Sequence, residues 1–166
     1  PPDRRAAVHG LLAESLRGRS AVVCDADRVA AATRAIEHLH SDVLLLDDGF
    51  QHRRLARDLD IVTIDASNPF GNEHLLPAGI LREPIKNLDR ADCIVLTRSS
   101  DSETELIERI RQVTNAPIFQ SRTIIENFHA LHSHDLQDAA ALAEPVAAFC
   151  GIGNPRAFFS QLRSVA

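Results

Sequence analysis

Short continuous runs of apolar residues alternate along the chain with segments of helical periodicity, and this alternation most constrains the fold. The apolar runs are residues 21–24, 43–46, 61–64, 93–96 and a run that starts at 118. They are apolar at consecutive positions rather than at every second one, which is typical of strands buried on both faces of a parallel sheet. Apolar spacing predicts helices at 4–16, 27–39 and 101–113. We therefore expect an α/β domain with a doubly wound, mostly parallel sheet.

The pattern changes near residue 122. Residues 123–131 read as extended, residues 147–150 as a strand, and the Phe158-Phe159 stretch as one face of a helix after a glycine-containing turn. We therefore expect residues 1–122 to be part of a core domain, and residues 123–166 to hold linker strands and the start of a second, smaller α/β unit.

Charge and basic residues limit the function classes. The 166 residues carry 18 Lys and Arg against 23 Asp and Glu, a formal net charge of −5, whereas proteins that bind duplex nucleic acid usually show a basic surface. Lys86 is the only lysine, and it does not lie in a G-x-x-x-x-G-K-[ST] loop. We therefore expect no nucleic-acid partner and no phosphate-binding P-loop within this sequence.

Cysteine use and hydropathy favour the cytoplasm. The three cysteines are far apart, form no C-x-x-C motif and each sit in or after an apolar run, which predicts buried thiols in a reducing compartment. No apolar run approaches the roughly 18 residues that a membrane span needs. Contact with a membrane surface remains compatible with these observations.

The strongest candidate site is the sequence Asp47-Asp48-Gly49-Phe50-Gln51-His52, which follows an apolar run. A strand would deliver both carboxylates to the carboxyl edge of the sheet, where open α/β sheets bind ligands. Carboxylates there order Mg²⁺ on phosphate oxygens, and Gln51 and His52 would position a hydroxyl, water or phosphate near the same edge. The alternative is that the acid pair only ends a strand and caps a turn.

Two further segments offer candidate residues. The long stretch from Asn72 to Pro84 contains Arg82, which could clamp an anionic group; the alternative is a proline-rich surface loop. Arg28, after the first apolar run, could reach the same sheet edge as Asp48, or it could simply be a solvated residue at a helix start.

Other motifs are weaker. Gly151-Ile152-Gly153 is a fragment of a dinucleotide-binding pattern but reads better as a tight strand-to-helix turn. The histidine tract at 129, 132 and 134 has no zinc spacing and reads as exposed loop. Asp65 ends a predicted strand, either as support for the site or as a turn acid.

The motifs together resemble the tetraacyldisaccharide 4′-kinase family, the lipid A 4′-kinases. The resemblance rests on four blocks in family order across residues 22–165: Asp27-Arg28-Val29; the Asp47–His52 string; Gly71-Asn72 with Leu76–Pro84; and Gly151–Pro155 with Phe158-Phe159. Any one block is weak, but the four together are specific.

The resemblance implies a P-loop-NTPase-like fold and transfer of a phosphoryl group from ATP, with Mg²⁺, to the 4′-hydroxyl of a tetraacylated disaccharide 1-phosphate. It implies work at the cytoplasmic face of the bacterial inner membrane, on a lipid A precursor. Asp47, Asp48 and His52 would be catalytic, with Asp48 as the metal ligand. Gln51 and Arg28 would bind the nucleotide, while the substrate would be bound by Asn72, Arg82 and Glu83.

The sequence also departs from the family pattern. The family's Walker A loop would precede Pro1, its G-D-E-P element is replaced by Ala7-Val8-His9-Gly10, and its F-P-D-H-H element would follow Ala166. We therefore expect a partial kinase that is inactive alone and needs the missing P-loop segment as its partner. The alternatives are a non-catalytic nucleotide-binding remnant of this fold and a Mg²⁺-dependent phosphohydrolase.

Overall fold

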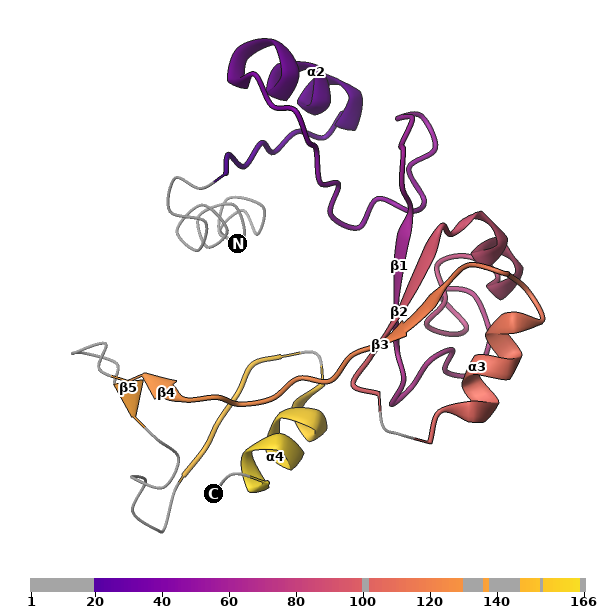
Figure 1. Cartoon of the computed structure of the whole chain (residues 1–166), viewed down its shortest axis with the longest axis vertical. Helices are drawn as coiled ribbons and strands as arrows, with labels where there is room; N and C mark the ends of the chain where they lie inside the picture. The colour runs from indigo at the N-terminus through magenta and orange to yellow at the C-terminus, as the bar shows by residue number, and fades with distance from the viewer. Residues whose placement is uncertain (1–19, 100–101, 130–135, 138–146, 153, 165–166) are drawn as a thin grey trace.

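The computed structural model describes residues 20–99, 102–129, 136–137, 147–152 and 154–164. The chain forms a small α/β structure in which the sheet lies between α2 at one end and α4 at the other (Figure 1). The elements in chain order are α2 (Arg28–Leu39), β1 (Ile61–Asp65), the 3₁₀ helix η1 (Ile85–Arg90), β2 (Cys93–Thr97), α3 (Thr104–Arg111), β3 (Ile118–Gln120), β4 (Phe128–His129), β5 (Leu136–Gln137) and α4 (Pro155–Arg163). The predicted helix at 4–16 lies outside the described residues.

The main sheet has three parallel strands in the order β1-β2-β3. Ile61 pairs with Cys93 and Asp65 with Thr97, so β1 and β2 begin and end together. These strands confirm the predictions at 61–64, 93–96 and 118. A separate pair, β4 and β5, is antiparallel and falls partly within the segment that was predicted to be extended.

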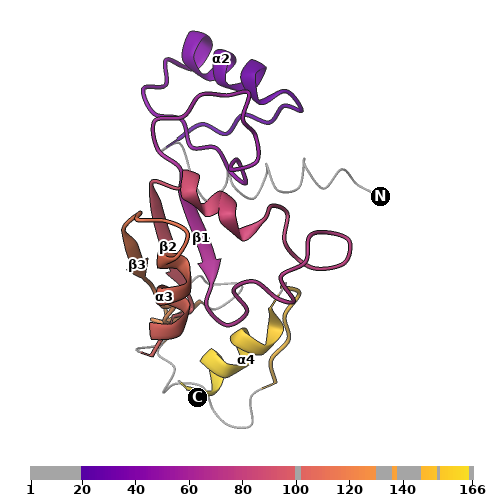
Figure 2. The same ribbon diagram turned by 90° about the vertical axis from the view of Figure 1, so that its right-hand side faces the viewer.

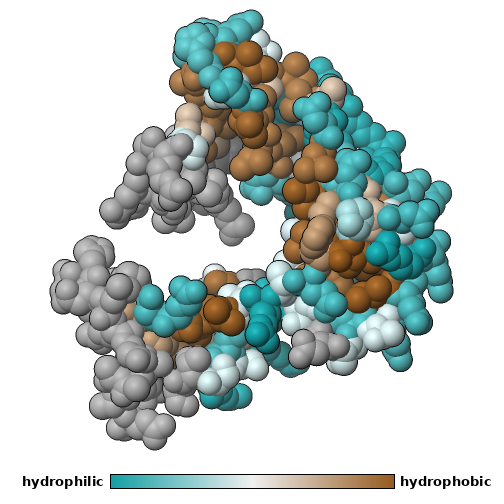
Figure 3. Space-filling model, in the orientation of Figure 1, coloured by the Kyte–Doolittle hydropathy of each residue, from teal (hydrophilic) through white to brown (hydrophobic). Residues whose placement is uncertain are grey.

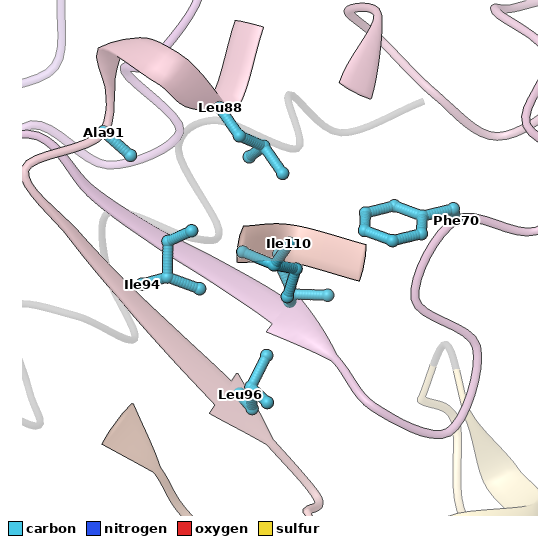
Figure 4. Close-up of a cluster of buried hydrophobic side chains, with 7 residues drawn as sticks. Phe70, Leu88, Ala91, Ile94, Leu96 and Ile110 are labelled. Atoms are coloured by element: carbon cyan, nitrogen blue, oxygen red, sulfur yellow. The ribbon is translucent and has the colours of Figure 1, made fainter. Parts of the chain in front are cut away.

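The hydrophobic core lies on one face of this sheet. Ile94 and Leu96 of β2 are fully buried together with Ile110 of α3, and Figure 4 shows them beside Phe70 and Leu88. In Figure 2, α3 lies against the sheet and η1 lies near the start of β1. On the opposite face, Ile61 is 55% and Phe119 57% exposed. The α/β class is confirmed, but the described residues cover one face of the sheet rather than both.

Three predicted strands are not formed in the described structure. Residues 21–24 and 43–46 have no regular secondary structure; Val43 is 78% and Leu45 95% exposed. An internal strand of a parallel sheet requires a hydrogen-bonded neighbour on each side, and the described residues do not supply one here. This end of the molecule therefore shows a hydrophobic surface around α2 (Figure 3). The strand at 147–150 is also not formed, and Phe149 is 95% exposed.

Helices α2 and α4 begin where the sequence predicts. Asp27 caps α2 by accepting from the backbone N–H groups of Val29 and Ala30, and Asn154 caps α4 by accepting from Ala157. Side-chain oxygens at the N-cap satisfy backbone donors that have no partner inside the helix. The described residues Gly151, Ile152 and Asn154 thus lead into a helix, as the sequence indicated.

Candidate functional site

The acidic residues Asp47 and Asp48 lie on a tight exposed turn. Asp48 adopts a left-handed backbone conformation (φ 51°), and the N–H of His52 donates to the carbonyl of Gly49 at 2.8 Å. Aspartate tolerates this conformation better than most residues. A Cβ on Gly49 would lie 2.4 Å from the Leu46 side chain. Gly49 is therefore needed for close packing, while Asp48 provides the unusual backbone angle.

The turn lies near the amino ends of β1 and β2, which corrects the expected position at the carboxyl edge. The carbonyl of Phe50 accepts from Arg90 at 3.2 Å, and Arg90 ends η1 shortly before β2 begins. Because residues 43–46 do not enter the sheet, they do not carry the acid pair to its carboxyl edge.

The turn contacts the third motif block, which contains Arg82, directly. Arg82 forms an ion pair with Asp48, 34 residues away in sequence. The side chains of Arg82 and Asp48 are 57% and 65% exposed, so the pair contributes at most about 1 kcal/mol to stability. Its significance is spatial, because the structure brings together a predicted metal ligand and a predicted anion-binding residue.

The segment from Ser67 to Pro84 is an internally bonded loop. The N–H of Leu76 donates to Leu81 at 2.8 Å, and the N–H of Gly79 to Leu75 at 3.0 Å. The Asn72 side chain donates to the Ala78 carbonyl at 2.9 Å. A Cβ added to Gly79 would lie only 2.2 Å from the side-chain oxygen of Asn72. Asn72 therefore shapes this loop from inside. Its predicted contact with substrate stays a prediction.

Glu83 has structural partners that the sequence did not reveal. Its carboxylate pairs with Arg90 and accepts from the Asn87 side chain at 2.7 Å. Arg90 also lies over the Phe50 ring, 4.1 Å from its centre. Arg90 was missed because no local pattern in the sequence links it to Phe50, 40 positions earlier, or to Glu83, 7 positions earlier.

The remaining predicted site residues lie in two places. Arg28 is the first residue of α2, whereas Gln51 and His52 follow the two aspartates of the acidic turn. Arg28 donates to the Asp25 carbonyl. His52 is half-buried, whereas Gln51 is exposed. The two backbone N–H groups at the start of α2 lower the pKa of Asp27, and the positive charge of Arg54 lowers it further. Asp27 and Arg54 line the same hollow, so the start of α2 lies close to the residues that follow the acidic turn.

The carboxyl edge of the sheet carries a different cluster. Arg98 donates to both oxygens of Asp65, one at 2.9 Å, and Ser67 donates to Asp65 through its N–H (3.1 Å) and its hydroxyl (2.7 Å). These bonds, above all those from Arg98, hold the pKa of Asp65 well below its usual range. The Asn154 side chain donates to the Ser67 hydroxyl at 3.3 Å, which ties α4 to this edge. Asp65 is thus both a turn acid and a structural anchor.

The two carboxylates of the acidic turn are the described residues that could hold a magnesium ion at the predicted site. Among the described residues, no three His, Cys, Asp or Glu side chains form a metal-binding group. Mg²⁺ commonly binds one or two carboxylates and completes its coordination with water and substrate phosphates. Asp47 and Asp48 are both exposed, so their oxygens fit that requirement.

Three further observations concern a surface hollow, membrane spans and the cysteines of the described part of the chain. An open hollow beside α2 is lined by Asp25, Asp27, Arg34 and Arg54 among others, and none of the predicted site residues lines it. Within the described ranges no helix is long and apolar enough to cross a membrane. The three cysteines are free, and Cys24 is exposed rather than buried as expected.

Comparison with known proteins identifies similar sequences. The family model described as tetraacyldisaccharide-1-P 4′-kinase matches residues 10–166. The chain is 44% identical over 135 residues to the tetraacyldisaccharide 4′-kinase of Syntrophobacter fumaroxidans, covering 79% of this chain and 35% of that protein. It is 43% identical over 162 residues to the protein of the same name from Anaeromyxobacter dehalogenans strain 2CP-C, covering 93% and 42%. The chain thus spans about two fifths of the length of such relatives. No solved structure matches it significantly.

Proposed function

Because the chain belongs to the tetraacyldisaccharide-1-P 4′-kinase family, we propose that the protein that carries it phosphorylates the 4′-hydroxyl of a tetraacyldisaccharide 1-phosphate, a lipid A precursor. ATP is the phosphoryl donor and Mg²⁺ the metal. In this proposal the reaction takes place at the cytoplasmic face of the bacterial inner membrane, as the family resemblance implies. Within this proposal, the described residues supply an acidic, metal-binding part of the site, and a P-loop segment elsewhere in the protein binds the phosphates.

The observation that carries the proposal is the contact between Asp48 and Arg82. It joins a residue that the resemblance assigns to catalysis and metal binding with one that it assigns to substrate binding. Phosphoryl transfer depends on positioning and on electrostatic stabilisation rather than on covalent chemistry by the protein. A carboxylate and a guanidinium on facing loops provide one group for a cation and one for an anion.

Each predicted residue has a role in this proposal. Asp48, with Asp47 beside it, would hold Mg²⁺, which would neutralise the charge that develops on the phosphate oxygens. His52 and Gln51 follow on the same turn and orient groups beside it. Arg82 binds the acceptor phosphate, with Asn72 and Glu83 shaping its loop. Arg28 contributes to the nucleotide side from the start of α2.

The test is phosphorylation of a tetraacyldisaccharide 1-phosphate acceptor by the protein as its gene encodes it, with ATP and a titration of Mg²⁺. We expect Asp48→Asn to lower kcat by about 100-fold or more, because the substitution keeps the shape of the side chain but removes the charge that binds the metal. Asp89→Asn is the matched control, since Asp89 is an exposed carboxylate on η1, and it should keep activity within about twofold.

Two results would refute the proposal. Absence of transfer to this acceptor by the unmodified protein would refute the activity. Equal kinetics of the Asp48→Asn and Asp89→Asn variants would refute the metal role of the acidic turn.

A further inference from the structure

Arg90 connects the two motif blocks that form the proposed site. It is the last residue of η1 and lies outside both blocks. Its guanidinium lies over the Phe50 ring, 4.1 Å from the ring centre, and donates to the Phe50 carbonyl at 3.2 Å. Phe50 follows Asp48 by two residues, so one side of Arg90 holds the acidic turn.

The other side of Arg90 holds the loop that carries Arg82. Its second terminal nitrogen pairs with Glu83, the residue next to Arg82, and the Asn87 side chain donates to the same carboxylate oxygen at 2.7 Å. One planar guanidinium thus contacts a ring, a carbonyl and a carboxylate from two loops. A lysine ammonium has no plane to stack and no fixed pair of donors.

Burial indicates which contact fixes the geometry. The Asp48 and Arg82 side chains are 65% and 57% exposed, whereas those of Glu83 and Arg90 are only 18% and 25% exposed. Exposed ion pairs contribute little and are screened by salt, while partly buried pairs are screened less. The inner pair therefore holds the two loops, and the outer pair meets as a result.

A buried nitrogen of Arg90 without a hydrogen-bond partner also supports a specific role for this residue. Within the described structure, Nε of Arg90 is buried without a hydrogen-bond partner. A buried polar atom without a partner lowers stability, so the site keeps Arg90 at a cost that a purely structural role could avoid with an apolar residue. Its other contacts are two hydrogen bonds, to Phe50 and Glu83, and the ring contact with Phe50, and an arginine can make all three at once.

We propose that Arg90 is a positioning residue that sets the distance between the acidic turn and Arg82, acting through Phe50 and Glu83. Its effect on catalysis depends on the proposed function; its effect on the two loops does not. Small displacements of catalytic groups can lower rates strongly, so the consequence should appear in kcat more than in substrate affinity.

The test compares Arg90→Lys with Arg109→Lys in the protein as its gene encodes it. Arg109 is a close match because its guanidinium lies 5.5 Å from the centre of the Phe70 ring and pairs with Glu73, yet it does not touch the acidic turn in the described contacts. The first readout is amide hydrogen exchange, measured by mass spectrometry. We expect Arg90→Lys to speed exchange several-fold in peptides that cover residues 46–56, where the N–H of His52 is bonded to Gly49, and Arg109→Lys to leave them unchanged.

The second readout is kinetic. We expect Arg90→Lys to lower kcat about tenfold or more, with the KM for ATP changed less than threefold, and Arg109→Lys to behave as the unmodified protein. Should Arg90→Lys not fold, Phe50→Leu removes the ring while keeping the Glu83 pair, and it must speed the same exchange. Unchanged exchange in 46–56 would overturn the proposal. Faster exchange in a protein without kinase activity would instead refute only the proposed function.

Discussion

The pair of Asp65 and Arg98 gives the sharpest test of the electrostatics at the carboxyl edge of the sheet. Asp65 ends β1, and Arg98 follows β2 with a left-handed backbone (φ 53°). The Asp65 carboxylate accepts two hydrogen bonds from Arg98 and two from Ser67. We consider Asp65→Asn, which keeps the shape of the side chain but removes its charge and puts a donor where an acceptor was.

The size of the effect follows from the contacts and their exposure. A hydrogen bond to a charged group contributes about 1.5–3 kcal/mol. The Asp65 side chain is 28% and that of Arg98 35% exposed, so solvent screening favours the lower end of that range. We expect a loss of about 2 kcal/mol in the free energy of unfolding. For a chain of this size, that corresponds to a fall in Tm of roughly 4–8 °C at pH 7.

The pH dependence has a definite sign. The pKa of Asp65 is lower in the folded state, so its stabilising contribution is fully present above the unfolded-state pKa near ~3.9 and declines as pH falls below that value. Thermal unfolding from pH 7 to pH 3 should therefore show a constant difference between unmodified and Asp65→Asn proteins down to about pH 5, and a smaller difference below about pH 4.

Glu73→Gln is the control for this measurement. Its pair with Arg109 is more exposed, with side chains at 47% and 46%, and we expect a change below about 0.5 kcal/mol. If the two variants lose equal stability, or if the Asp65→Asn difference persists unchanged at pH 3, the stabilising role of the Asp65 charge is wrong.

Two further substitutions test the site and the core. Arg82→Ala should raise the KM for the acceptor more than it lowers kcat, and steady-state kinetics with an unchanged KM would make Arg82 a plain loop residue. Leu96→Ala should lower the free energy of unfolding by about 3 kcal/mol in urea denaturation, because Leu96 is fully buried. Leu59→Ala, at a side chain 57% exposed, should cost far less, and equal losses would contradict the described core.

The local sequence pattern predicts those elements whose hydrogen bonds are made within the element or with another predicted element. The runs that became β1 and β2 are bounded, rich in β-branched residues and covered by α3 and the loop around Phe70. The run at 43–46 is equally continuous in its apolar residues, although Val43 is its only β-branched one, and an apolar run alone does not provide the neighbouring strand that it needs. The helix cap at Asp27 was predictable because a cap is satisfied within three residues.

The residues of the candidate site were predictable from the sequence, but the contacts that hold them in place were not. The acid pair and Arg82 are conspicuous in the sequence, and the structure places Asp48 in contact with Arg82. Arg90 and Arg98 each join residues between 7 and 40 positions away. Arginine is common on protein surfaces, so nothing local distinguishes these two from the other arginines of the chain. Their roles depend on which loops the fold brings together.

The long segment between β1 and β2 shows why length alone is weak evidence for function. A parallel connection must return from the carboxyl end of one strand to the amino end of the next, which takes a dozen residues or more whatever the chain does. Here the segment is bonded to Asp65 through Ser67 at one end, anchored by the buried Phe70, and bonded to Arg90 through Glu83 at the other. Topology therefore accounts for its length. Topology does not account for the contact between Arg82 and Asp48 near the amino ends of the strands. A crossover connection needs no charged residues at that point, so this contact is the reason to test the segment for a role in catalysis.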